Sequence, residues 1–184
     1  DVETVCEAAD ELRRRQIGDT VTYVINRNIN YTNVCQYSCR FCAFSKGGGE
    51  VAAGRAAYDI DAGELHRRVK EAAALGATEV CLQGGIHPDY TGQTYLDILR
   101  TVKEAASAIH VHAFSPLEID QGASTLNLPL EQYLSMLKDA GLDSLPGTAA
   151  EVLDERVRDI LCADKVSAER WLEIMECAHG LGLS

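Results

Sequence analysis

The stretch Cys35-Gln36-Tyr37-Ser38-Cys39-Arg40-Phe41-Cys42 carries three cysteines in the spacing C-x3-C-x2-C, and no fourth cysteine follows nearby. An iron–sulfur cluster that only carries electrons usually has four thiolate ligands. Three thiolates hold three irons of a four-iron cluster and leave the fourth iron open, and an open position distinguishes catalytic from structural metal sites. The stretch therefore predicts chemistry at a [4Fe-4S] cluster bound by Cys35, Cys39 and Cys42.

A zinc site is the main alternative for these three cysteines. Zinc prefers four ligands, which are commonly supplied by paired C-x2-4-C units. The second pair is missing here, so the cluster is the better interpretation. A chance grouping of free thiols comes third.

Strands and helices alternate on both sides of the cysteine stretch. Such alternation predicts a parallel sheet with right-handed crossovers. The period-two and period-3.6 patterns predict strands at residues 20–25, 79–83, 110–115 and 142–145, and helices at 3–16, 61–76, 94–108, 129–141, 152–161 and from 167 onward.

The predicted fold class is α/β, a partial (β/α) TIM-like barrel that is truncated at its C-terminus. A full barrel needs roughly 200 residues or more, and the helix–glycine–strand junction that recurs along the chain appears once more at Leu181-Gly182-Leu183. We therefore expect an N-terminal helix in residues 1–18 and the first part of a barrel domain, about four β/α units, in residues 19–184. A small open α/β domain, complete at 184 residues, is the alternative.

The predicted strand ends indicate where the active site lies, because (β/α) barrels place it at the carboxyl ends of their strands. The cysteine stretch follows the first strand, while Gly84-Gly85, Ser115-Pro116 and Pro146-Gly147-Thr148 follow the next three. We expect these four segments to meet on one face. The run Gly47-Gly48-Gly49 predicts a flexible loop beside the cysteines.

Charge and composition exclude several classes of partner. The formal net charge is -11 and the only basic run, Arg13-Arg14-Arg15, lies in a predicted helix with acidic neighbours, so a nucleic-acid partner is not expected. No apolar stretch approaches the length of a membrane span, and no signal peptide opens the chain. Seven cysteines in such a chain favour the reducing cytoplasm.

The cysteine stretch, with the aromatic Phe41 before its last cysteine, resembles the signature of the radical S-adenosylmethionine (SAM) enzymes. The resemblance implies two cofactors, a [4Fe-4S] cluster and SAM, whose cleavage yields a 5'-deoxyadenosyl radical that abstracts hydrogen from the substrate. Gly84 and Gly85 match the two glycines of the family's SAM contact, and Phe41 is expected beside the cofactor. Ile86 stands where the family often has an acidic residue.

Further blocks are similar to the tyrosine-using half of the FO synthase family, which makes a deazaflavin chromophore. The implied enzyme is a transferase that joins the 4-hydroxybenzyl part of L-tyrosine to 5-amino-6-(D-ribitylamino)uracil. It implies a reducing electron donor and a second radical SAM subunit or fused domain that cyclises the product. A futalosine-pathway (menaquinone) radical SAM enzyme and a non-catalytic iron–sulfur or zinc module remain alternatives. The similar blocks are Asn26 to Cys35, Cys42-Ala43-Phe44-Ser45, Gln83 to Pro88, His110 to Pro116 and Leu145 to Glu151.

Four residues are candidates for substrate contact. Asn28 and Asn30, followed by Thr32, alternate as polar residues along the first strand, and we expect them to line the cavity, since unpaired polar groups are costly in a core. His112 shares a strand face with His110. For His112, contact with the substrate and simple packing are equally good interpretations. Glu151 follows a strand end.

Other residues have plainer interpretations. Glu118, like Glu151, is expected either at SAM or substrate or as a solvated or helix-start glutamate, where the helix dipole stabilises it. The scattered cysteines are expected to be small buried residues; they are Cys6, Cys81, Cys162 and Cys177.

Overall fold

The computed structural model describes residues 1–46 and 56–184, so the predicted Gly47-Gly48-Gly49 loop lies outside the described residues. Its centre is a sheet of parallel strands in the order β1-β2-β3, namely β1 (Asn26–Asn30), β2 (Glu79–Gln83) and β3 (His110–Ala113). The strands run in the same direction, and the segment after β1 lies beside the residues that follow β2 and β3. The parallel sheet confirms the predicted α/β class.

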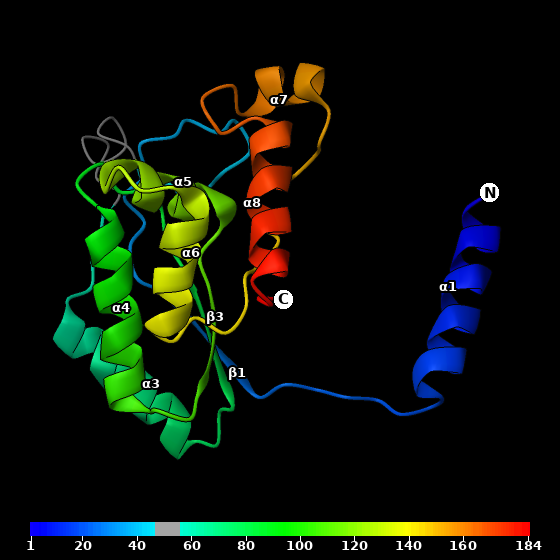
Figure 1. The fold of residues 1–184 in the computed structure, drawn as a ribbon, viewed down its shortest axis with the longest axis horizontal. Coiled ribbons are helices and arrows are strands. Elements are labelled where there is room, and N and C mark those ends of the chain that lie inside the picture. The colour runs from blue at the N-terminus through cyan, green and yellow to red at the C-terminus, as the bar shows by residue number, and fades with distance from the viewer. Residues whose placement is uncertain (47–55) are drawn as a thin grey trace.

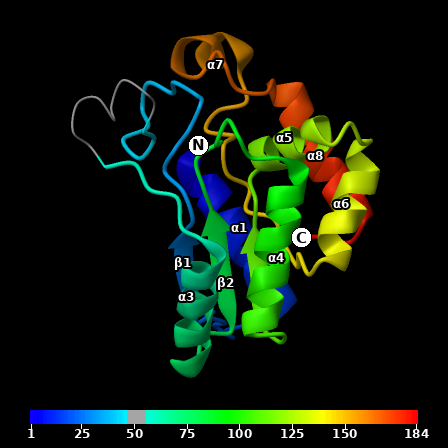
Figure 2. The same ribbon diagram turned by 90° about the vertical axis from the view of Figure 1, so that its left-hand side faces the viewer.

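Helices α3 (Ala62–Ala74) and α4 (Gly92–Ala105) form the crossovers between the strands and lie in front of the sheet in Figure 2. Their capping explains where they begin: the Asp61 side chain accepts from the N–H of Glu64, and Thr91 and Thr94 form a capping box. The other helices along this part of the chain are α5 (Pro116–Thr125), α6 (Leu130–Asp139), α7 (Glu155–Leu161) and α8 (Ala168–Gly180).

The two faces of the sheet differ in chemistry, as strand alternation requires. The face toward α3 and α4 is apolar and fully buried, with Ile29, Val80, Leu82 and Val111 at 0–1% exposure. The opposite face, here called the inner face, carries the alternate residues of each strand. They are Asn26, Asn28 and Asn30 on β1, Glu79, Cys81 and Gln83 on β2, and His110 and His112 on β3.

A fourth strand at residues 142–145 was predicted, but only a single parallel bridge joins Ser144 to His112. The N–H of Leu145 donates to the carbonyl of Ser184, so the segment after α8 begins to pair where the next strand of a barrel would lie. The described part thus holds three strands and one bridged position of the four predicted units.

Two other elements differ from the prediction. Residues 20–25 form no strand: Val21 and Tyr23 are 87% and 85% exposed, and β-branched residues alone do not form a strand without a partner to complete the hydrogen bonds. The unpredicted α5 begins with Pro116 and a capping box between Ser115 and Glu118. That serine–proline–x–glutamate pattern is a sequence signal for a helix start.

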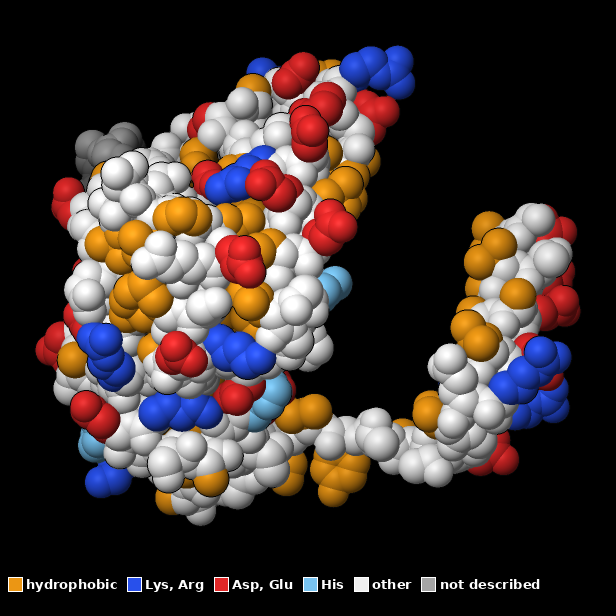
Figure 3. Space-filling model, in the orientation of Figure 1, with side chains coloured by type: hydrophobic (Ala, Val, Ile, Leu, Met, Phe, Trp, Pro, Cys, Tyr) orange, Lys and Arg blue, Asp and Glu red, His pale blue; other side chains and the backbone are white. Residues whose placement is uncertain are grey.

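Helix α1 (Val2–Ile17) stands apart from the rest of the structure (Figure 1) and contains no buried residue. Its predicted apolar stripe exists and is visible along one side of the helix in Figure 3, but Val5 and Leu12 are 68% and 56% exposed. The division into residues 1–18 and 19–184 stays a prediction. In the described residues, no helix has both the length and the apolar character needed to cross a bilayer.

Candidate functional site

A cavity of about 220 Å³ lies at the carboxyl ends of the strands, where the sequence places the site. It brings together all three cysteines of the C-x3-C-x2-C stretch and four further predicted residues. The residues around it are Cys35, Tyr37, Cys39, Phe41, Cys42, Phe44, Ser45, Gln83, Gly84, Gly85, Ile86, Ser115, Leu117, Glu118, Thr148, Ala149, Glu151 and Lys165. Segments following β1, β2, β3 and the bridged Ser144 therefore meet here, as expected.

The cysteine stretch is fixed by backbone hydrogen bonds to two other segments. The N–H of Gln36 donates to the carbonyl of Ile86 (2.9 Å), just after the double glycine. The N–H of Arg40 donates to the carbonyl of Leu161 at the end of α7 (2.9 Å). The N–H of Ser38 donates to the carboxylate of Asp164 (2.7 Å).

The three thiols are free and differ in environment. The N–H of Ser45 donates to Sγ of Cys42 (3.4 Å). Burial raises the pKa of the Cys39 thiol to about 11, although nearby Lys165 lowers it. A ligand thiol in such a place needs a metal to hold it deprotonated.

The donor set fits a cluster better than a single ion. Over residues 1–46 and 56–184, no three His, Cys, Asp or Glu side chains are grouped closely enough to hold one metal ion. A four-iron cluster instead binds each thiolate through a different iron, so its ligands stand further apart. Three free thiols around one cavity suit that arrangement, and a mononuclear zinc site is not formed by the described residues.

Gly84 and Gly85 pack against the segment that leads from β1 into the cysteines. A Cβ on Gly84 would lie 2.4 Å from the Tyr31 ring, and a Cβ on Gly85 would lie 2.2 Å from the carbonyl oxygen of Val34 and 2.9 Å from Cβ of Cys35. No side chain fits in either place. The two glycines thus allow the β2 loop to touch the start of the cysteine stretch, in addition to the predicted SAM contact.

Glu118 is only 1% exposed and makes its hydrogen bonds beneath this loop. Its Oε1 accepts from the N–H of Gly84 (3.2 Å) and from the hydroxyl of Tyr31, and its Oε2 accepts from the N–H (2.6 Å) and hydroxyl (2.7 Å) of Ser115. Burial raises the pKa of Glu118, and these hydrogen bonds lower it by less. The helix-start interpretation of Glu118 is confirmed, and the solvated one is wrong because the β2 loop covers it.

Lys165 completes the opposite wall. Its side chain is 8% exposed, pairs with Glu151 (2.7 Å) and lies over the Phe41 ring, 5.3 Å from its centroid. Ala149 and Glu151 have φ values of 65° and 46°, in a region that non-glycine residues rarely occupy. Such backbone strain is concentrated at functional sites. No sequence pattern identified Lys165, because it stands alone in a loop between two helices.

Residues 29–184 match the family model of the radical SAM superfamily. The chain belongs to this superfamily. The match begins within β1 and covers β2, β3, the cavity and the helices from α3 onward.

Several relatives within the superfamily are much more similar than a shared fold requires. The chain is 48% identical over 182 residues to FO synthase from Streptomyces coelicolor, and the alignment covers 99% of this chain and 20% of that protein. It is 46% identical over 178 residues to 5-amino-6-(D-ribitylamino)uracil–L-tyrosine 4-hydroxyphenyl transferase from Methanocaldococcus jannaschii, covering 95% of this chain and 48% of the relative. The chain thus spans between a fifth and a half of the length of these relatives.

Two solved structures share the fold at low sequence identity. Methylornithine synthase superposes with a TM-score of 0.69 at 19% identity, over 96% of this chain and 47% of that one. The [FeFe]-hydrogenase maturase HydG superposes with a TM-score of 0.66 at 15% identity, over 96% of this chain and 36% of that one. The partial radical SAM fold is thereby established.

The remaining substrate candidates of this superfamily member lie on the inner face, not around the cavity. Asn28 and His112 stand in one row across the sheet, since both align with Cys81. Asn30 aligns with Gln83, which does border the cavity, and its side chain donates to the Gln83 carbonyl (3.2 Å). Thr32 is different: it is fully buried and donates to the carbonyl of Tyr58 (2.9 Å), so its expected place in the cavity is wrong.

The cysteines outside the cavity fit the packing interpretation unevenly. Cys162 is buried as predicted, and Cys81 and Cys177 are partly buried. Cys6 is exposed, because α1 packs on no other described element.

Proposed function

We propose that the protein is a radical SAM transferase that joins the 4-hydroxybenzyl part of L-tyrosine to 5-amino-6-(D-ribitylamino)uracil in the biosynthesis of the deazaflavin FO. The observation that carries the proposal is the 46% identity to the named transferase over 95% of this chain. This chain also has a cavity in which three cysteines, two glycines and a buried carboxylate converge.

In this proposal Cys35, Cys39 and Cys42 hold the [4Fe-4S] cluster. When bound, the cluster and SAM supply a one-electron cleavage that gives the 5'-deoxyadenosyl radical. Gly84 and Gly85 leave room for close approach of SAM to the backbone.

Phe41, which is 49% exposed, forms part of the cavity wall beside the cofactor. Its ring is fixed by Lys165, and Lys165 in turn by Glu151. Glu151 therefore holds the wall in place and presents a carboxylate to SAM or the substrate. Ile86, which is 4% exposed, contributes apolar surface where many relatives in the superfamily carry an acid.

The polar residues of the inner face bind the substrates. Asn28, Asn30 and His112 offer donors and acceptors that match the amide and hydroxyl groups of the two proposed substrates. Asn30 aligns with Gln83 at the border of the cavity, and Asn28 and His112 lie one row further from it. A cytoplasmic electron donor and a second radical SAM protein or domain, which closes the ring of the product, complete the proposal.

The test is anaerobic reconstitution of the full protein that contains this chain, followed by assay with reductant, SAM, tyrosine and the uracil. We expect about four irons per chain and tyrosine-dependent formation of 5'-deoxyadenosine. Cys39→Ser should lose both, while Cys6→Ser, a change at an exposed cysteine of α1, should lose neither. Formation of 5'-deoxyadenosine that does not depend on tyrosine, with no coupled product, would refute the proposal.

A further inference from the structure

A single serine links the two histidines of β3 on the inner face. Nε2 of His110 and Nδ1 of His112 each lie 2.7 Å from Oγ of Ser144. A serine hydroxyl has one proton to donate and accepts further hydrogen bonds. Only one imidazole at a time can accept the hydroxyl proton of Ser144, and the other can then donate to the same oxygen, so Ser144 couples the proton positions of the two rings.

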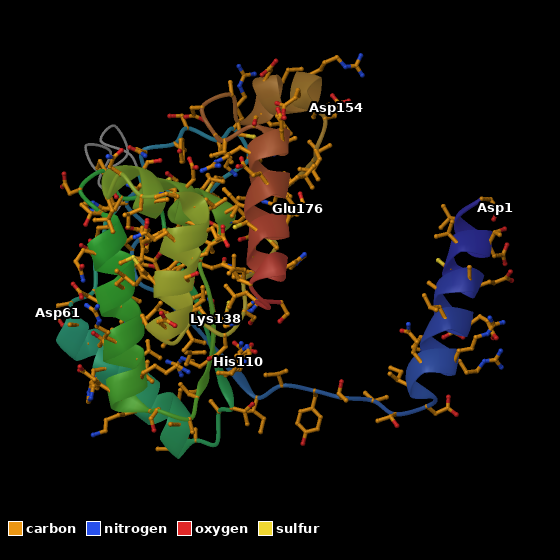
Figure 4. The ribbon with its side chains drawn as sticks, viewed as in Figure 1. Asp1, Asp61, His110, Lys138, Asp154 and Glu176 are labelled. Atoms are coloured by element: carbon orange, nitrogen blue, oxygen red, sulfur yellow. The ribbon has the colours of Figure 1, made fainter. Side chains whose placement is uncertain are left out.

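One end of this chain of side chains is acidic. A carboxylate oxygen of Glu79 lies 3.8 Å from Nε2 of His110, and Asn26 donates to the other oxygen of the same carboxylate. His110 lies at the beginning of β3, at the end of the sheet far from the cysteine stretch (Figure 4), so a proton that reaches it has moved away from the cavity.

The other end is a neutral base. Burial lowers the pKa of His112, His110 lowers it further, and Glu79 raises it by less than burial lowers it. Among the residues that the structure describes, Nε2 of His112 has no hydrogen-bond partner. It belongs to a residue of the row that also contains Asn28 and Cys81, on the face proposed to hold the substrate.

We propose that His112 is the base of the transfer and that Ser144 relays its proton to His110. A ligand N–H bond breaks as a proton joins Nε2 of His112, and the proton on Nδ1 passes to Ser144. The proton of Ser144 passes to Nε2 of His110, and the resulting imidazolium lies beside the Glu79 carboxylate. His112 and Ser144 each end with as many protons as they began with, and His110 has gained one.

The ligand is the aminouracil, so this inference rests on the proposed function. A carbon radical that adds to an aminouracil ring leaves an unpaired electron on the ring. Loss of that electron to a one-electron oxidant, for which the cluster left oxidised by SAM cleavage would serve, leaves a cationic ring, whose N–H group is a strong acid. A neutral acceptor beside the ring completes the product by taking that proton, which is general base catalysis.

The pH dependence follows from the groups that face the two histidines. They are Glu79 and Cys81 on β2 and Asp143, which lies next to Ser144 and is paired with Lys103 (2.8 Å). The pKa of Cys81 is raised and that of Asp143 is lowered, so neither changes charge near neutral pH. Coupled product should therefore decline as the pH falls through the lowered pKa of His112.

Three variants of the full protein test the relay. His112→Asn keeps a polar group near Ser144 and removes Nε2, Ser144→Ala keeps both histidines and breaks the link, and His179→Asn is a control on the exposed surface of α8. We expect His112→Asn and Ser144→Ala to lower the ratio of coupled product to 5'-deoxyadenosine, on the order of 10²-fold for a lost general base. His112→Asn should also lose the acidic limb of the pH profile.

Titration of the histidines by ¹⁵N NMR supplies a readout that does not depend on turnover. In the unreconstituted protein, Ser144→Ala should shift the titration of His112, while His179→Asn should leave it unchanged. An unchanged titration of His112 in Ser144→Ala, or a wild-type pH profile in His112→Asn, would overturn the relay. Absence of coupled product from the wild type would instead refute the proposed function, and with it the role of His112 as base.

Discussion

The carboxylate of Glu118 accepts a hydrogen bond from the backbone N–H of Gly84 across 3.2 Å, inside the protein. This bond joins the first turn of α5 to the loop that follows β2, so it fixes the double glycine from beneath. Since Gly85 in turn touches Val34 and Cys35, the position of the cysteine stretch depends on a residue that does not contact the cysteines' backbone.

Replacement of Glu118 by glutamine should destabilise the fold. Each carboxylate oxygen accepts from a backbone N–H, that of Gly84 or that of Ser115. In either orientation the glutamine amide therefore leaves one buried N–H without an acceptor, at a cost of about 1–3 kcal/mol. Urea unfolding measures the loss, and Glu169→Gln on the exposed surface of α8 is the control.

The stability contributed by Glu118 should depend on pH with a definite sign. Burial raises its pKa in the folded protein above the unfolded value of about 4.3. A raised carboxyl pKa favours folding below the unfolded pKa, and that contribution is lost as the pH rises through the folded pKa. As the pH rises from acidic to neutral, the free energy of unfolding of the wild type should therefore fall relative to that of Glu118→Gln. A difference that grows with pH would contradict this account.

Gly85→Ala should prevent cluster assembly. The added Cβ would lie 2.2 Å from the Val34 carbonyl oxygen, which is backbone and must move, together with the start of the cysteine stretch. Overpacking of this kind costs about 1–3 kcal/mol, and we expect iron content after reconstitution to fall well below wild type. Gly147→Ala is the matched control, because a Cβ there meets no atom within 4 Å. Equal iron in the two variants would count against the role assigned to Gly85.

Lys165→Met should weaken the wall of the cavity that Phe41 forms. The change removes the ion pair with Glu151 and the contact over the Phe41 ring from a side chain that is 8% exposed. We expect a loss of about 1 kcal/mol or more in unfolding free energy, because a partly buried carboxylate is left unpaired. Arg156→Met, at a side chain that is 92% exposed, should stay within about 0.5 kcal/mol of wild type.

The sequence was informative where residue spacing determines structure. The cysteine stretch, the double glycine, and strands β2 and β3 with their crossover helices lie where they were predicted, because strand ends and glycine loops follow local rules. The strand predicted at 20–25 failed, since a strand exists only where a neighbour supplies hydrogen bonds. Helix α5 was missed although Ser115 and Glu118 encode its capping box.

The parts of the site that were missed depend on contacts between distant segments. Lys165 contacts Phe41, which lies 124 positions earlier in the sequence, from a loop that carries no motif. Ser144 meets His110 and His112 only because residues 142–145 return to the edge of β3. Burial of Glu118 likewise follows from the loop after β2 covering the start of α5. None of these contacts follows from a local sequence pattern, because each joins segments that lie far apart in the chain.

The most direct test of the central claim is transfer of label from tyrosine. The reconstituted full protein would be incubated with reductant, SAM, the uracil and tyrosine labelled with ¹³C in its ring, and the products would be analysed by mass spectrometry. We expect a uracil product that carries the whole labelled ring, formed together with 5'-deoxyadenosine and absent from Cys39→Ser. A labelled ring that never appears on the uracil, despite a full cluster and cleavage of SAM, would contradict it.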